Sequence, residues 1–409
     1  MSEHIRIYIS MIIAFVIVVG YESFVSFLVR RDYQKLIAIY KTSQPTTTIQ
    51  PTQAYFFKPT ITLPSVISTG MPTNIPIPTL TWYPTPIKIP TKAPTRIPTR
   101  APTTVPTKAP AVSQRVSKSK LSIFIIGSYT AGAKRILEEN PPLVKIIEPT
   151  SDGAFFEALR AYKQRVPDGL AIVRFWEGTA GLKYPLESNP VNAAQDFFNR
   201  VVQPGLNRLG SNKNLFDYLQ TPNEFETTPE WWGETKIRWN GAFWRKLTEL
   251  NINAGIKTCI GGIPVGNVQA TELGFMIEDL KVMKQLGAAF CYHGYTFDYS
   301  KDVNNEIQLS LRYRQFYNYF RDNASELVNM PLILSEGGVA ENGDSFAGYQ
   351  KYGHSAQYES WLEWFDSELR KDNYVKGVTL FQIGNNSDWN AFNLEPISNW
   401  LADYIRSQQ

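Results

Sequence analysis

From residue 121 onward, the chain alternates short apolar runs with amphipathic helical segments eight times. The apolar runs are bounded by proline, glycine or polar residues, as is typical of parallel strands that are buried on both faces. The predicted strands are residues 122–127, 143–148, 169–175, 215–219, 256–261, 288–295, 331–335 and 377–383. Helical spacing is clear between them, for example where Leu273, Met276 and Leu280 recur. This alternation restricts the chain to folds built on a mainly parallel sheet.

Eight strand–helix units over about 290 residues fit a (β/α)8 TIM barrel. A doubly wound open sheet is the alternative, and it usually carries a glycine-rich phosphate loop after its first strand. The residues at that position, Gly127-Ser128-Tyr129, lack this fingerprint. We therefore predict an α/β domain over residues 121–409 with the TIM-barrel architecture.

The first 30 residues carry a hydrophobic segment. Residues 7–20 are uncharged and apolar, which is short for a bilayer span but suits a signal peptide. The apolar character continues to Val29, so a retained membrane anchor is a second interpretation, and a buried helix is a third. Arg30, Arg31 and Lys35 follow the segment, and the positive-inside tendency would keep that side cytoplasmic.

Residues 31–120 are predicted to be a disordered, Pro/Thr-rich linker. From Pro90 a Pro-Thr pair recurs every four residues up to Pro106, which favours an extended polyproline II spacer. Such a stalk favours export, with the barrel displayed extracellularly on a membrane anchor or secreted, and we give this more weight than the positive charges. The linker is either a passive stalk or also a basic contact to an anionic cell wall or membrane surface.

The positive charge of the chain is concentrated at its N-terminal end. Residues 1–120 hold 14 Lys and Arg against three acidic residues, a net charge of +11, whereas the other 27 basic and 34 acidic residues give −7. A basic balance confined to the leader and linker argues against nucleic acid as a partner of the barrel. The two cysteines, Cys259 and Cys291, exclude a disulfide framework and are predicted to be buried thiols in strands.

Two glutamates close predicted strands at positions where a barrel carries its catalytic groups. Glu224 follows the fourth strand in Thr-Pro-Asn-Glu, and Glu336 follows the seventh in Leu-Ser-Glu-Gly-Gly. A carboxylic acid that protonates the leaving oxygen, paired with a carboxylate that attacks the sugar, is what a retaining glycosidase requires. The alternative interpretation of each glutamate is an exposed loop carboxylate.

The whole barrel resembles the clan A glycoside hydrolases, a superfamily of (β/α)8 enzymes that includes the family 5 cellulases. The resemblance implies that Glu224 is the acid/base and Glu336 the nucleophile. It implies that Asn223, which precedes the acid/base, binds the sugar 2-hydroxyl. His293 and Tyr295 form the His-x-Tyr found on strand six, in which the tyrosine bonds the nucleophile and the histidine contacts substrate.

Further candidates surround these motifs. Arg174 closes the third strand and would orient the nucleophile and keep it ionised, although the family usually places such an arginine on strand two. Aromatic rings stack on the apolar faces of sugars, and the candidates for such subsites are Trp176, Trp231, Trp232 and Trp389. Packing in the core is the alternative for each of them. The chain departs from the family at the end of strand eight, where Phe381-Gln382-Ile383-Gly384 stands in place of a tryptophan.

The sequence thus predicts a monomeric, surface-anchored or secreted retaining glycoside hydrolase that acts on a carbohydrate substrate. No cofactor and no metal site is expected. The alternative is a noncatalytic glycan-binding protein that keeps the pocket of a glycosidase-like barrel without turnover.

Overall fold

The computed structural model describes residues 115–147, 153–176, 178–385, 387 and 389–409. These residues belong to a compact unit that spans Ala109–Gln409. The hydrophobic segment predicted in residues 1–30, and nearly all of the linker predicted in residues 31–120, lie outside the described residues. Within the described ranges, no helix is both long enough and apolar enough to span a bilayer.

Eight parallel strands close into a barrel in chain order, with the last strand paired to the first. The strands are β1 (Leu121–Ile125), β2 (Leu143–Ile147), β3 (Leu170–Arg174), β4 (Tyr218–Leu219), β5 (Lys257–Ile263), β6 (Ala289–Thr296), β7 (Leu332–Val339) and β8 (Val375–Ile383). The predicted (β/α)8 TIM barrel is confirmed, and an open doubly wound sheet is excluded.

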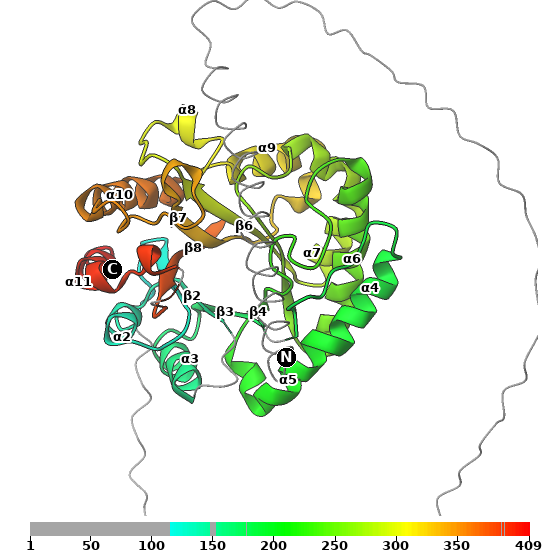
Figure 1. Ribbon diagram of the computed structural model, residues 1–409, viewed down its shortest axis with the longest axis horizontal. Coiled ribbons are helices and arrows are strands. Elements are labelled where there is room, and N and C mark those ends of the chain that lie inside the picture. Colours follow the sequence, from blue (N-terminus) through cyan, green and yellow to red (C-terminus); the bar gives the residue numbers. More distant parts are fainter. Residues whose placement is uncertain (1–114, 148–152, 177, 386, 388) are drawn as a thin grey trace, which may run out of the picture. The chain divides into compact units, whose positions relative to one another are not determined.

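Helices alternate with the strands and surround them (Figure 1). They are α2 (Ala131–Leu137), α3 (Gly153–Arg165), α4 (Pro190–Phe197), α5 (Gln203–Leu209), α6 (Glu234–Asn253), α7 (Ile277–Gln285), α8 (Val303–Glu306), α9 (Tyr313–Asn323), α10 (Ser355–Lys371) and α11 (Ser398–Ser407). Their apolar faces pack on the outer side of the strands and bury the larger part of the hydrophobic core.

The strand that carries Glu336 is longer than predicted. The prediction ended it at residue 335, because two glycines follow Glu336, but β7 continues to Val339. Gly337 is required by packing within the strand, since a Cβ atom there would lie 2.5 Å from Cγ2 of Val378. Strand four is shorter than predicted, because β4 contains only the last two residues of the predicted range 215–219.

The interior of the barrel holds a second, smaller cluster of buried side chains contributed by six strands. Its members are Leu143, Ile172, Tyr218, Cys259, Ala289, Cys291 and Ile333. Both cysteines are buried, as predicted, but they are not free thiols. Cys259 and Cys291 form a disulfide with a Cα–Cα distance of 5.6 Å. The two residues lie on the adjacent strands β5 and β6 and project to the same interior face, a proximity that their sequence spacing does not reveal.

Candidate active site

The polar residues of the candidate site lie two positions further along their strands than the residues of the interior cluster. Successive side chains of a strand alternate between its two faces, so a residue two positions later points to the same side. The interior residues and their polar successors are Leu143 and Lys145, Ile172 and Arg174, and Cys291 and His293. Alternation therefore places three basic side chains at the carboxyl-end side of the barrel interior.

Glu336 joins this group through an irregularity in strand pairing. Tyr292 of β6 pairs with Leu334 of β7, but the next residue, His293, pairs with Glu336, so Ser335 is skipped. An extra residue in one strand reverses which side chains face inward beyond it. The register shift therefore brings Glu336 beside His293 in the barrel interior.

Both carboxylate oxygens of Glu336 are held by hydrogen bonds. Lys145 Nζ donates to Oε1 at 2.9 Å, and the hydroxyl of Tyr295 donates to Oε2 at 3.0 Å. The side chain of Glu336 is only 7 % exposed. Tyr295 thus lies where the His-x-Tyr motif implies. Burial, followed by the charges of Glu336 and Glu224, raises the pKa of Tyr295, which keeps its hydroxyl a neutral donor.

Lys145 was missed by the sequence analysis. It lies on β2, is fully buried, and its Nζ is 4.0 Å from the centre of the Phe124 ring. Burial lowers the pKa of Lys145 to about 8, although the charge of Glu336 acts in the opposite direction. Lys145 is the only charged residue within the apolar run Leu-Val-Lys-Ile-Ile. Burying an unpaired lysine costs free energy, so a lysine in such a run indicates a buried acidic partner.

Glu336 is held in its ionised form. Burial by itself would raise the pKa of Glu336. Electrostatic interactions with His293, Lys145 and Arg174 outweigh burial and lower the pKa of Glu336 to about 2. Above that pH the carboxylate is ionised.

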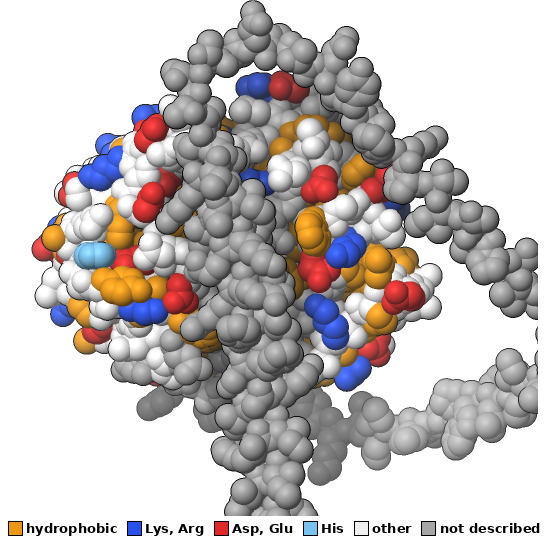
Figure 2. All heavy atoms as spheres, turned by 45° about the horizontal axis from the view of Figure 1, so that its top comes forward, with side chains coloured by type: hydrophobic (Ala, Val, Ile, Leu, Met, Phe, Trp, Pro, Cys, Tyr) orange, Lys and Arg blue, Asp and Glu red, His pale blue; other side chains and the backbone are white. Residues whose placement is uncertain are grey.

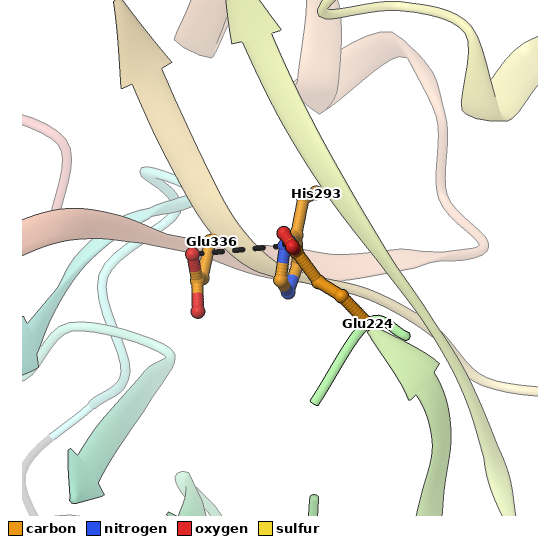
Figure 3. Close-up of side chains that lie close together, drawn as sticks. All are labelled: Glu224, His293 and Glu336. Carbon is orange, nitrogen blue, oxygen red and sulfur yellow. Dashed lines mark hydrogen bonds and ion pairs between the residues drawn. The ribbon is translucent and has the colours of Figure 1, made fainter. Parts of the chain in front are cut away.

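Glu224 lies in the loop that connects β4 to α6, with its side chain 31 % exposed. Its backbone adopts a left-handed conformation with φ of 48°, and its carbonyl oxygen accepts a 3.0 Å hydrogen bond from Nε1 of Trp231. One carboxylate oxygen of Glu224, one of Glu336 and one ring nitrogen of His293 lie within 4.8 Å of one another. Figure 3 shows the three side chains converging from the β4–α6 loop, β6 and β7.

His293 links the two carboxylates. Its Nδ1 is 2.8 Å from Oε1 of Glu224 and 3.6 Å from Oε2 of Glu336. Its Nε2 lies 3.5 Å from the amide nitrogen of Gln220, which also donates to Oδ1 of Asn223 at 2.9 Å. An amide nitrogen can only donate, so this arrangement makes Nε2 the acceptor and places the proton of the neutral ring on Nδ1, facing the carboxylates.

Arg174 lies close to Glu336, as predicted, with Nη1 4.0 Å from Oε1 of Glu336. Its shortest contact, however, is to Glu226, whose Oε1 lies 2.7 Å from Nη2. Arg174 therefore adds positive charge near Glu336 but orients Glu226 directly. Asn223 also approaches Glu226, with its Nδ2 at 3.4 Å. Glu226 lies only two residues beyond Glu224 and was not predicted from the sequence.

The four candidate sugar-stacking tryptophans separate into two groups. Trp176 and Trp232 are 46 % and 61 % exposed, and Trp389 is half-buried, so all three present surface. Trp231 is fully buried and packs against Trp244, with ring centres 6.5 Å apart. Of its two interpretations, core packing therefore holds for Trp231, because its ring is fully buried and its indole nitrogen supports the Glu224 loop.

Phe381 takes the place of the tryptophan expected at the end of β8. Its ring lies 6.4 Å from that of Tyr295 and 5.8 Å from that of Trp389, in edge-to-face arrangements. Trp389 thus extends an aromatic group that begins at Tyr295, which itself binds Glu336.

The spacing of Glu224, His293 and Glu336 would also suit three ligands of a metal ion. The electrostatics of this group do not favour a cation, because Lys145 already donates to Glu336 and Arg174 lies 4.0 Å from the same oxygen. A metal ion bound there would meet two positive charges at short range. We assign no metal to these residues.

Comparison with known proteins gives structural neighbours alone. No protein-family model matches the chain, and neither does any curated protein. A family 5 glycoside hydrolase from Prevotella bryantii B14 is 10% identical, with a TM-score of 0.41 over 68% of this chain and 87% of that one. A family 5 xyloglucanase from Paenibacillus pabuli is 9% identical, with a TM-score of 0.42 over 71% and 98%. The neighbours therefore lie among family 5 and related clan A glycoside hydrolases, at low sequence identity.

Proposed function

We propose that the protein is a retaining glycoside hydrolase that cleaves O-glycosidic bonds of an oligo- or polysaccharide. The observation that carries the proposal is the pair formed by Glu224 and Glu336, in which one oxygen of each carboxylate lies within 4.8 Å of one oxygen of the other. Retaining enzymes hold their two carboxyl groups about 5–5.5 Å apart, whereas inverting enzymes need about 6.5–9.5 Å to admit a water molecule.

Glu336 is the nucleophile in this mechanism. Its ionised carboxylate attacks the anomeric carbon, the bond from that carbon to the leaving oxygen breaks, and a covalent glycosyl ester forms. Lys145 and Tyr295 fix both oxygens of the carboxylate, so the attacking group is positioned before the substrate arrives. Their hydrogen bonds also favour the ionised form before attack.

Glu224 is the acid/base. In the first step it gives its proton to the departing glycosidic oxygen, and in the second it takes a proton from the water that hydrolyses the ester. His293 bonds Oε1 of Glu224 through Nδ1 and leaves Oε2 to carry the transferred proton. The greater exposure of Glu224 than of Glu336 suits a group that must meet both the leaving sugar and water.

The remaining residues support the binding of a carbohydrate. Asn223 lies between Gln220 and Glu226, which fixes its amide beside the acid/base for a contact to the sugar 2-hydroxyl. The exposed rings of Trp176, Trp232 and Trp389 are the candidate platforms for sugar rings.

We also propose that the barrel acts outside the cytoplasm, anchored or secreted, on the stalk formed by residues 31–120. The Cys259–Cys291 disulfide supports this location, because disulfides persist mainly in oxidising compartments. The basic residues of the stalk would then face an anionic wall or membrane surface.

The proposal is tested by hydrolysis of a panel of polysaccharides and aryl glycosides with the full-length protein, Glu336→Gln and Glu224→Gln. Wild-type turnover that is lost in Glu336→Gln supports the mechanism. Azide should restore the activity of a Glu224→Ala variant on an activated aryl glycoside, because azide can attack the glycosyl ester without a general base. Equal activity in wild type and Glu336→Gln would refute the assignment, and glycan binding without turnover would favour the noncatalytic alternative.

A further inference from the structure

The backbone of Glu224 adopts a conformation that costs free energy. Its φ of 48° lies in the left-handed region, where the Cβ atom of most residues crowds a neighbouring carbonyl oxygen. A residue with a side chain as large as that of glutamate keeps this conformation only when its surroundings impose it. The shape of the loop at Glu224 therefore depends on contacts that hold its backbone from outside.

The same backbone conformation decides where the carboxylate of Glu224 lies. Oε1 is 2.8 Å from Nδ1 of His293, and one carboxylate oxygen lies within 4.8 Å of one oxygen of Glu336. A change from the left-handed to the right-handed region would swing the Cα–Cβ bond and carry the carboxylate away from both partners. Misplacing a reacting group by about 1 Å can lower a rate by about 100-fold.

The indole of Trp231 fixes this backbone. Its Nε1 donates to the carbonyl oxygen of Glu224 at 3.0 Å. The direction of that carbonyl is set by the ψ angle of Glu224, so the hydrogen bond fixes the peptide plane that follows the residue. Glu224 is thus held at two points, at its carbonyl by Trp231 and at its carboxylate by His293.

Trp231 faces inward, unlike the other large rings of its loop. Phe225 and Trp232 are exposed, whereas Trp231 is fully buried. Exposed rings are ordinary on a surface such as the face visible in Figure 2, where hydrophobic side chains are interspersed with charged and polar ones. A buried indole N–H usually finds a hydrogen-bond acceptor, and the acceptor here is the backbone of the proposed acid/base.

Trp231 is itself fixed from the two neighbouring loops. The amide of Val268, in the loop after β5, donates to the carbonyl of Trp231 at 2.9 Å. Nη2 of Arg312, a buried residue directly before α9, donates to the carbonyl of Val268 at 2.8 Å. Both contacts that hold Glu224 therefore lead back to β6 and the segment that follows it, because β6 also carries His293.

Trp244 is the natural comparison for Trp231. The two rings pack against each other with their centres 6.5 Å apart, and both are fully buried. Within the described part of the chain, Nε1 of Trp244 has no hydrogen-bond partner. The two tryptophans therefore share an environment but differ in their contact with the loop of Glu224.

We propose that Trp231 is a positioning residue for the acid/base: its indole N–H holds Glu224 in the left-handed conformation that places the carboxylate opposite Glu336. This inference rests on the proposed function. Trp231 makes no contact with substrate in this role. Loss of its N–H should impair proton transfer to the leaving oxygen and leave the attack by Glu336 intact, so the effect is confined to leaving groups that need a proton.

Trp231→Phe tests the proposal, because it keeps an aromatic ring in the core and removes the donor. The substrates are the phenyl and dinitrophenyl glycosides of the sugar that the wild type hydrolyses. On the phenyl glycoside, whose departure needs a proton, kcat/KM should fall by about tenfold. On the dinitrophenyl glycoside, which departs without one, kcat/KM should stay within about twofold of the wild type. Trp244→Phe is the matched control and should change neither value.

Equal losses on the two glycosides, or no loss on either, would overturn the proposal, because a tryptophan that only packs would affect both alike. Thermal unfolding of each variant measures stability separately. Should Trp231→Phe fail to fold, the same comparison is made after replacing Trp231 by benzothienylalanine, which keeps the shape of the indole but has sulfur in place of the N–H.

A crystal structure of the folded variant tests the positioning without turnover. The carboxylate of Glu224 should leave Nδ1 of His293, and an unmoved carboxylate would contradict the role of Trp231. A wild type that hydrolyses no glycoside would refute the proposed function, whereas a displaced carboxylate in the variant would still support the positioning.

Discussion

Replacing Lys145 with methionine removes the cation closest to the proposed nucleophile while keeping a side chain of similar length. The pKa of Glu336 falls from 4.5 to about 2 in the folded protein, which corresponds to about 3 kcal/mol of preference for the ionised form. Lys145 contributes both charge and a 2.9 Å hydrogen bond to this preference. Without it, burial remains and the pKa of Glu336 rises.

Two effects of Lys145→Met follow from this geometry. A lost hydrogen bond to a charged group is worth about 1.5–3 kcal/mol, so kcat/KM should fall by about 10- to 100-fold. The acid limb of the pH profile of kcat/KM should also move to higher pH, because Glu336 must be ionised to attack. Breaking a buried ion pair should in addition lower the free energy of unfolding by about 3 kcal/mol.

The assay is a pH–rate profile on an aryl glycoside, with thermal unfolding of the same samples to separate activity from loss of fold. Lys145→Arg is the matched control, since it keeps the positive charge on the same strand and should retain the acid limb of the wild type. An unchanged acid limb in folded Lys145→Met would refute the role assigned to Lys145.

Three further outcomes are expected. Tyr295→Phe removes the donor to Oε2 of Glu336 and should lower kcat/KM by about tenfold with little change in the unfolding temperature, as measured by steady-state kinetics and calorimetry. Reducing the Cys259–Cys291 disulfide, which closes a loop of 32 residues, should lower the free energy of unfolding by about 3–4 kcal/mol in denaturant titrations with and without reductant; equal titrations would exclude the bridge. Because the pKa of Glu336 is lower in the folded than in the unfolded chain, its contribution to stability is present above pH 4.5 and is lost as the pH falls towards 2, and Glu336→Gln should flatten this dependence in acid unfolding curves.

The sequence was sufficient to predict the barrel because each buried strand appears as an apolar run between helix-forming segments. The ends of the strands are harder to predict. Residues 337 and 338 are glycines, which usually indicate the end of a strand, but here packing against Val378 requires the first of them. Counting strands placed Glu224 and Glu336 correctly around the barrel. It could not reveal the register shift at Ser335 that turns Glu336 inward.

The residues whose position or role was not predicted are ones whose side-chain type does not determine their environment. A tryptophan such as Trp231 suits a sugar platform or a core equally well, and its contact with Trp244 decides the matter. Lys145 could have been found from its isolation in an apolar strand, but its partner is 191 residues away in the sequence. The disulfide was equally hidden, because only the pairing of β5 with β6 brings Cys259 to Cys291.

The proposed mechanism depends most on the short separation of Glu224 and Glu336, and the configuration of the first product measures the consequence of that separation directly. Hydrolysis of an aryl glycoside should be followed by proton NMR from the first turnover, before the released sugar equilibrates between its anomers. Two displacements through a glycosyl ester on Glu336 predict a first product with the anomeric configuration of the substrate. A first product of inverted configuration would contradict the mechanism.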